Sequence, residues 1–150
     1  MTNSMQLLPP APTARKPQLS ASSPQQPCRI LCVDDDSMGL EFLGQILAAE
    51  GYAVVLSNRP VAALRTNLTR IDLAIVDFDM PGLNGRELLL LLRGLRATFP
   101  IILLSASAHS LPQPTRALFS RCIDKATPAH HVLDVVAHLL ATRQAPGQLT

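Results

Sequence analysis

The fold is decided by residues 71–88, IDLAIVDFDMPGLNGREL. This segment begins with a short apolar run, Leu73–Val76, that stops at two aspartates, Asp77 and Asp79. A leucine-rich stretch follows from Gly85 and ends before Pro100. A continuous apolar run of about four to eight residues predicts a buried strand, whereas a longer leucine-rich stretch predicts a helix. The segment therefore predicts one strand followed by one helix.

Outward from this segment, the same alternation of strand and helix occurs five times, beginning at Arg29. The other strands are predicted at residues 29–33, 53–57 and 101–104 and near Cys122 and Ile123. Helices are predicted at 38–50, after Asn58 as the N-cap residue, and at 85–98. A short element is predicted within 109–120, which contains Pro112 and Pro114. The last helix is predicted from Thr127 on, with Val132, Val135, Val136 and Leu139 facing inward. This alternation is typical of an α/β fold, a doubly wound five-stranded parallel sheet of the flavodoxin-like (βα)5 type.

Length and composition favour a single folded domain. The chain has 150 residues, of which 47% are hydrophobic, enough for one core. Residues 1–27 contain six of the 13 prolines and have no apolar period, so we predict a disordered tail there. The folded domain is predicted at residues 28–142, with a short tail at 143–150.

Several classes of function are disfavoured. The net charge is +2, the 13 Lys and Arg residues are scattered, and only 3% of residues are aromatic, so nucleic-acid binding has no support. The three cysteines include no CxxC pair, which argues against a disulfide framework or a zinc site. No apolar stretch reaches the roughly 20 residues of a membrane span. We expect a cytoplasmic protein without membrane contact.

Acidic side chains follow the predicted strands where each strand ends. In open parallel sheets, ligands collect at the carboxyl ends of the strands. A single aspartate there is more often a turn former or helix cap. Here five acids and one lysine stand at corresponding ends, and crowded carboxylates of this kind favour a hard cation such as Mg²⁺. The residues at these ends are Asp34, Asp35, Asp36, Asp77, Asp79, Ser105, Ser107 and Lys125.

The sequence resembles the receiver domain of bacterial response regulators, of the chemotaxis-regulator-like type, over roughly residues 29–142. Residues 29–37, RILCVDDDS, are similar to the first strand and acidic pair of that family. Residues 71–88 are similar to its phosphoacceptor strand and Met-Pro-Gly-x-x-Gly loop. PIILLSA at 100–106 and Asp124-Lys125 follow in the expected order.

The resemblance implies a two-component or phosphorelay protein rather than an enzyme. Its partners would be a sensor histidine kinase or histidine-phosphotransfer protein and a downstream protein reached by surface contacts, with no output domain in this chain. Mg²⁺ would be the cofactor. The implied roles are phosphoacceptor for Asp77, Mg²⁺ ligands for Asp35, Asp77 and the main-chain carbonyl of Asp79, a place beside the ion for Asp34, and phosphoryl contacts for Lys125 and Ser105.

Three departures from the family pattern affect the expected output. Cys122 stands three residues before the lysine, where the family has Tyr or Phe as its switch residue, and Ala126 replaces the common proline after that lysine. Leu118 and Phe119 replace a Gly-Ala pair. We therefore expect phosphoryl acceptance with a muted switch around Cys122. Asp36 has no implied role and suits a helix cap.

Two other interpretations stay open. Asp77-Phe78-Asp79 also resembles the nucleophile motif of haloacid-dehalogenase-type phosphatases, but that motif usually begins the chain and would leave Asp34 to Asp36 unexplained. A pseudo-receiver scaffold that is never phosphorylated is the second. Cys122 and Ala126 favour it, whereas the intact Asp35, Asp77, Ser105 and Lys125 argue against it. The four histidines are expected to be surface residues.

Overall fold

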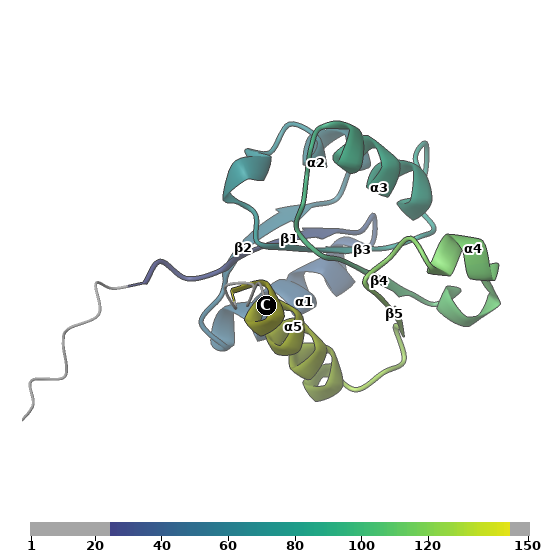
Figure 1. The fold of residues 1–150 in the computed structure, drawn as a ribbon. Helices are drawn as coiled ribbons and strands as arrows, with labels where there is room; N and C mark the ends of the chain where they lie inside the picture. Colours follow the sequence, from purple (N-terminus) through teal and green to yellow (C-terminus); the bar gives the residue numbers. More distant parts are fainter. Residues whose placement is uncertain (1–24, 145–150) are drawn as a thin grey trace, which may run out of the picture.

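The computed structural model describes residues 25–144. The predicted tails at 1–27 and 143–150 lie mostly outside this range. Five parallel strands form one sheet in the order β2-β1-β3-β4-β5 (Figure 1). The predicted doubly wound parallel sheet is therefore confirmed. The strands are β1 (Arg29–Val33), β2 (Ala53–Ser57), β3 (Leu73–Val76), β4 (Ile101–Ser105) and β5 (Arg121–Asp124).

Helices cover both faces of this sheet. Helices α1 and α5 lie on one face and α2 and α3 on the other, while α4 lies beyond the β5 edge (Figure 1). The helices are α1 (Ser37–Ala49), α2 (Pro60–Ala63), α3 (Gly85–Gly94), α4 (Gln113–Arg116) and α5 (Ala129–Gln144), with 3-10 turns η1 (Leu68–Arg70) and η2 (Ala108–Ser110). The short α4 agrees with the two prolines, since proline removes a backbone donor.

Side chains alternate across each strand, so the sheet separates two apolar cores. One core lies under α2 and α3 and includes Val33, Val76, Leu88 and Phe99. The other lies under α1 and α5 and includes Cys32, Leu47, Ile75 and Val136. Because β1, β3 and β4 have core residues on both faces, they are apolar along nearly their whole length.

Helix α3 ends at Gly94, so the prediction that it continues to residue 98 is wrong. Arg96 adopts a left-handed backbone with φ 66°, which cannot continue a right-handed helix. The guanidinium of Arg93 donates 2.8 Å hydrogen bonds to the carbonyls of Ala97 and Phe99 and thereby holds the turn into β4. Leu95, expected inside the helix, is its C-cap.

Two smaller expectations also need correction. The N-cap of α2 is Arg59, not Asn58, and its side chain makes no capping hydrogen bond. On α5 the fully inward residues are Val132, Val136 and Leu140, whereas Val135 and Leu139 are only partly buried at the margin of the core. The inward stripe therefore has a spacing of four residues, slightly displaced from the predicted one.

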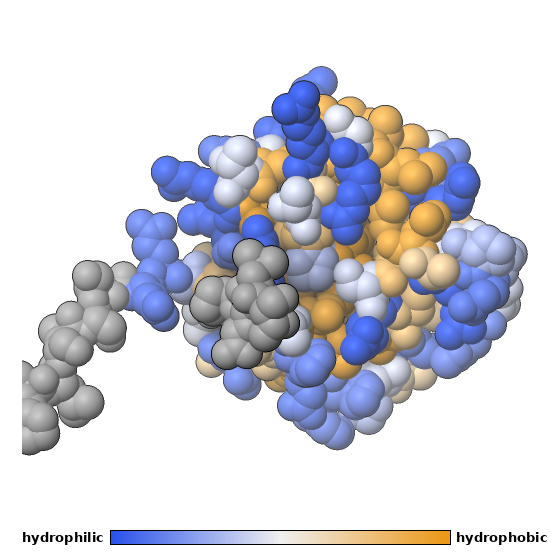
Figure 2. All heavy atoms as spheres, viewed as in Figure 1, coloured by the Kyte–Doolittle hydropathy of each residue, from blue (hydrophilic) through white to orange (hydrophobic). Residues whose placement is uncertain are grey.

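The outer face of α3 is apolar toward the C-terminal end of the helix. Leu90, Leu91 and Leu95 are each more than 40% exposed. Figure 2 shows this apolar surface over α3, beside hydrophilic groups. Within residues 25–144, no helix combines the length and apolar character that a membrane span requires.

Candidate metal and phosphoryl site

The aspartates after β1 and β3 are positioned by hydrogen bonds that continue the sheet. The amide of Asp77 donates to the Val33 carbonyl at 2.9 Å, and the amide of Asp34 donates to the Ser57 carbonyl at 3.2 Å. These bonds extend the β1–β3 and β1–β2 ladders past the last strand residues. The sheet itself therefore fixes where Asp34 and Asp77 stand.

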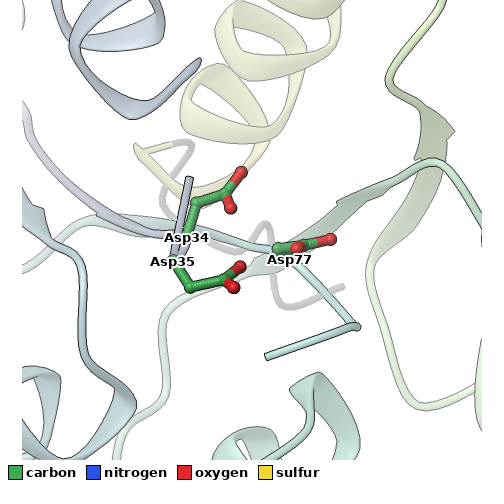
Figure 3. A group of neighbouring side chains, drawn as sticks. All are labelled: Asp34, Asp35 and Asp77. Atoms are coloured by element: carbon green, nitrogen blue, oxygen red, sulfur yellow. The ribbon is translucent and has the colours of Figure 1, made fainter. Parts of the chain in front are cut away.

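Three carboxylates meet at this edge. One oxygen from each of Asp34, Asp35 and Asp77 lies within 4.8 Å of the others. Figure 3 shows the three side chains at the ends of β1 and β3. Asp77 is buried, Asp34 is partly buried and Asp35 is exposed, so the cluster has one open side. Of the five aspartates expected at these strand ends, Asp34, Asp35 and Asp77 come together in this cluster, and Asp36 and Asp79 are not part of it.

Lys125, immediately after β5, is the cation of the cluster. Its Nζ lies 2.7 Å from Asp34 Oδ2 and 3.4 Å from Asp77 Oδ2. Its amide donates to the Ser105 carbonyl at 3.3 Å, which extends the β4–β5 ladder. The described residues contain no cis peptide, so the Lys125–Ala126 bond is trans and the lysine still reaches both carboxylates.

The cluster shifts the pKa values of its members. Burial, together with the negative charge of Asp34, raises the pKa of Asp77 above the usual aspartate range, against the opposing effects of Lys125, the Phe78 amide and the Ser105 hydroxyl. Burial alone would lower the pKa of Lys125, but its contacts with Asp34 and Asp77 raise it. Asp77 is therefore a crowded carboxylate for which additional positive charge would be favourable.

The donor set fits a bound Mg²⁺. Three carboxylates against one ammonium leave two uncompensated negative charges, and all the candidate ligand atoms are oxygens, which hard divalent cations prefer. Asp34 already accepts from Lys125 and, at 3.0 Å, from the Asp36 amide. Asp77 also has two partners, the Phe78 amide at 2.8 Å and Lys125 at 3.4 Å, so the exposed Asp35 is the most available ligand of the three.

The loop after β3 returns to the end of that strand at Gly85. The Gly85 amide donates to the Phe78 carbonyl at 2.9 Å, and a Cβ at this position would lie 2.6 Å from the Asp77 carbonyl oxygen. Only glycine permits this approach. Gly82, at φ 85°, supplies the turn that the Met-Pro-Gly segment needs.

Ser105 is the last residue of β4, one residue beyond the predicted end of that strand, and Ser107 lies in the loop that follows. Together they connect β4 to the loop after β3. Ser105 is completely buried, and its Oγ lies 3.1 Å from Ser107 Oγ. Ser107 Oγ donates to Asp79 Oδ2 at 2.7 Å. The sequence marks Ser107 only as a strand-end residue and has no signal that pairs it with Asp79, because 28 positions separate the two.

The remaining predicted positions lie around this edge. Cys122 is partly buried in β5, and its Sγ donates to the Arg116 carbonyl at 3.5 Å. Asp36 is the N-cap residue of α1, as expected, but its side chain makes no capping hydrogen bond. All four histidines are exposed, as predicted. Cys28, Cys32 and Cys122 form no disulfide.

Comparison with known proteins agrees with this geometry. The family model for the response regulator receiver domain matches residues 30–136. The two-component response regulators ARR10 and ARR12 of Arabidopsis thaliana are each 42% identical over 88 residues, 57% of this chain. That match spans only 15% and 14% of the two plant proteins.

Solved structures show the same fold. Response regulator protein TrrA from Thermotoga maritima, in complex with Mg²⁺-BeF, superposes with a TM-score of 0.69 at 29% identity, over 75% of this chain and 98% of TrrA. A CheY-like receiver domain protein from Methanospirillum hungatei JF-1 gives a TM-score of 0.70 at 25% identity, over 79% of this chain and 97% of its own.

Proposed function

Because this chain belongs to the response regulator receiver domain family, a family of signalling domains rather than typical enzymes, we propose that it accepts a phosphoryl group on Asp77. The supporting observation is the convergence of Asp35, Asp77 and Lys125 at one sheet edge. Asp77 is the acceptor, Asp35, Asp77 and the main-chain carbonyl of Asp79 hold Mg²⁺, and Asp34 stands beside the ion.

The chain's own groups suit this transfer. Phosphoryl transfer depends on positioning and charge neutralisation more than on covalent chemistry by the protein. Lys125 is already within ion-pair distance of Asp77, and the Phe78 amide holds Asp77 Oδ1 at 2.8 Å, which leaves Oδ2 as the nucleophilic oxygen. Bound Mg²⁺ would neutralise charge on the phosphoryl oxygens. Ser105, buried beside Asp77, offers a hydroxyl donor to the product.

The proposed phosphodonor is a protein histidine, from a sensor kinase or a histidine-phosphotransfer protein. Next to the acidic pocket, an open groove of about 180 Å³ lies between α1 and α5 and includes Asp34, Lys125 and the exposed Phe42. Met38, which lies on α1 as Phe42 does, is 83% exposed. An apolar surface beside an acidic, cation-binding pocket suits a protein donor that brings its histidine over Asp77.

The test is labelling by a small phosphodonor. With acetyl phosphate and Mg²⁺, mass spectrometry should find one added phosphoryl group that base and hydroxylamine remove, as they remove an acyl phosphate. Asp77→Asn should abolish the label, and Asp36→Asn, an exposed neighbour, should keep it. Label that survives in Asp77→Asn, or that maps to Ser105 or a histidine, would contradict the proposal.

Magnesium binding is tested separately. We expect amide resonances of Asp35 and Asp77 to shift on Mg²⁺ titration, and Asp35→Ala to weaken binding while Asp36→Asn does not. Binding that persists unchanged in both Asp35→Ala and Asp77→Asn would remove the metal assignment.

The alternative is a pseudo-receiver that binds partners without phosphorylation, and Cys122 at the switch position favours it. Burial raises the pKa of the Cys122 thiol, so this side chain is a small neutral group. It would give little differential packing between two states, which is why we propose a muted switch in β5. A chain that binds Mg²⁺ but takes no label from acetyl phosphate or a phosphohistidine donor would support the pseudo-receiver.

A further inference from the structure

A hydrogen-bond chain of Ser105, Ser107 and Asp79 joins the loop after β4 to the loop after β3. Ser107 Oγ lies 2.7 Å from Asp79 Oδ2 and 3.1 Å from Ser105 Oγ. The Ser107 amide also donates to Ser105 Oγ at 3.3 Å. Ser105 is fully buried and Ser107 is partly buried, so the two bonds between them are sheltered from solvent, whereas Asp79 is exposed and its bond from Ser107 lies at the surface.

Counting protons gives the direction of the chain. A carboxylate only accepts, so the single hydroxyl proton of Ser107 goes to Asp79. Ser107 Oγ is then an acceptor toward Ser105, and the Ser105 hydroxyl is the donor in that pair. The Ser105 proton thus has two competing acceptors, Ser107 Oγ and the Asp77 carboxylate, whose pKa its hydrogen bond lowers.

We propose that Ser107 is a positioning residue that holds the Ser105 hydroxyl in a resting hydrogen bond and opposes its transfer to a phosphoryl group on Asp77. This inference rests on the proposed function. The Ser105 hydroxyl has one proton, so its hydrogen bond to Ser107 Oγ must break before it can donate to a phosphoryl oxygen. The cost of that exchange lowers the population of the phosphoryl-bound arrangement.

The Asp79 side chain gives this restraint its strength. A hydrogen bond to a carboxylate is stronger than one between neutral groups, and linked hydrogen bonds polarise one another. The Asp79 side chain therefore has a role of its own, to hold Ser107, besides the metal-binding role proposed for the Asp79 carbonyl. Ser107 is unsuited to be the phosphoryl donor itself, because it would have to give up its bond to Asp79.

The experiment measures beryllofluoride affinity at saturating Mg²⁺ by amide NMR, since the chain has no tryptophan. Ser107→Ala should bind beryllofluoride about two- to tenfold more tightly than wild type, the factor that corresponds to one neutral hydrogen bond. Ser107→Thr keeps the hydroxyl and should restore wild-type affinity. Ser110→Ala is the matched control, because Ser110 lies in the same loop and bonds only to the Ser107 carbonyl.

A double-mutant cycle separates this mechanism from a general effect on the loop. Ser105→Ala should weaken beryllofluoride binding. In that background Ser107→Ala should not tighten binding as it does in wild type, because the Ser105 hydroxyl proton is no longer present. An equal gain in both backgrounds would overturn the proposal. So would weaker binding by Ser107→Ala, which would make Ser107 a phosphoryl ligand.

Failure of the proposed function is recognisable in the same titration. If wild type and every variant bind no beryllofluoride with Mg²⁺ present, the receiver mechanism falls and this inference falls with it. If wild type binds and Ser107→Ala binds equally well, the role of Ser107 alone is wrong. Thermal melting of each variant shows whether it is folded.

Discussion

Gly85 stands where the loop after β3 leaves no room for a side chain. Main-chain atoms of Asp77 and Phe78 occupy the space that a side chain would need. A Cβ at Gly85 would lie 2.6 Å from the Asp77 carbonyl oxygen and 2.9 Å from Phe78 Cα. Main-chain atoms cannot rotate away as the end of a flexible side chain can. Any other residue must therefore displace the strand end that presents Asp77.

We predict that Gly85→Ala destabilises the protein by about 1–3 kcal/mol, the usual cost of overpacking, and weakens Mg²⁺ binding. Urea unfolding and Mg²⁺ titration are the measurements. Gly94→Ala is the control, because a Cβ at Gly94 meets nothing within 4 Å and alanine suits a helix better, so this variant should be neutral or stabilised by up to about 1 kcal/mol. Equal stability of Gly85→Ala and wild type would contradict the prediction.

Asp77 affects stability through its charge. Its pKa is raised in the folded protein by burial and by Asp34, so the folded state binds its proton more tightly than the unfolded state does. This contribution is fully present below the pKa of the unfolded aspartate and is lost as pH rises through the folded pKa. At neutral pH without metal, ionised Asp77 therefore destabilises the fold.

Asp77→Asn should accordingly melt at a higher temperature than wild type at pH 7.5 in EDTA. The difference should shrink as pH falls through the folded pKa of Asp77 and vanish once the carboxyl is protonated in both states. Asp36→Asn, an exposed neighbour, should show no such pH-dependent gain. If Asp77→Asn melts at or below the wild-type temperature at pH 7.5, the charge-crowding argument is refuted.

At the scale of elements, α3 begins with a complete capping box. Asn84 Oδ1 accepts from the Glu87 amide, and Glu87 Oε2 accepts from the Asn84 amide, both at 2.9 Å. The box satisfies two amides that the helix cannot pair internally. Because Gly85 is the first residue of α3, the box also fixes how the helix departs from the site loop.

Asn84→Ala should cost about 1 kcal/mol of unfolding free energy, the usual value for a lost N-cap. Urea denaturation at constant pH measures it. Asn58→Ala tests the position where the sequence predicted a cap that the structure lacks, and it should have no measurable effect. A comparable loss of unfolding free energy in both variants would mean that Asn84 stabilises the protein by something other than capping.

In the molecule as a whole, the strand order that defines the fold also assembles the site. The sheet edge that brings Asp34, Asp77, Ser105 and Lys125 together exists because β1, β3, β4 and β5 are adjacent and parallel. Residues within the described range 25–144 form both apolar cores and the contacts of the site given above.

Removal of residues 1–24 should therefore leave the melting temperature and the Mg²⁺ affinity unchanged. Differential scanning calorimetry and an NMR titration of the shortened chain are the measurements. The boundary must spare Cys28, whose carbonyl accepts from the Ala53 amide at 2.9 Å at the start of the β1–β2 pairing. A drop of several degrees on removing residues 1–24 would show that this segment supports the fold.

The amino-acid sequence by itself determined the strands and the edge at which the acids meet. Continuous apolar runs of strand length are expected where a strand is buried on both faces of a sheet, as β1, β3 and β4 are, and this pattern is local in the chain. All five strands stand within one residue of their predicted bounds, and Asp34, Asp77 and Lys125 each follow a strand as expected. The parallel order then makes their meeting a geometric consequence.

The contacts between loops, in contrast, arise from the tertiary structure. Asp79 and Ser107 lie 28 positions apart, and Arg93 ends α3 early by binding carbonyls of the turn into β4. The Asn58 cap was wrong because a capping bond depends on where the side chain points, not on residue type alone. Hydrogen-bond partners are chosen by proximity in three dimensions, whereas strand and helix periodicity is set by neighbouring residues, and only the second can be read along the chain.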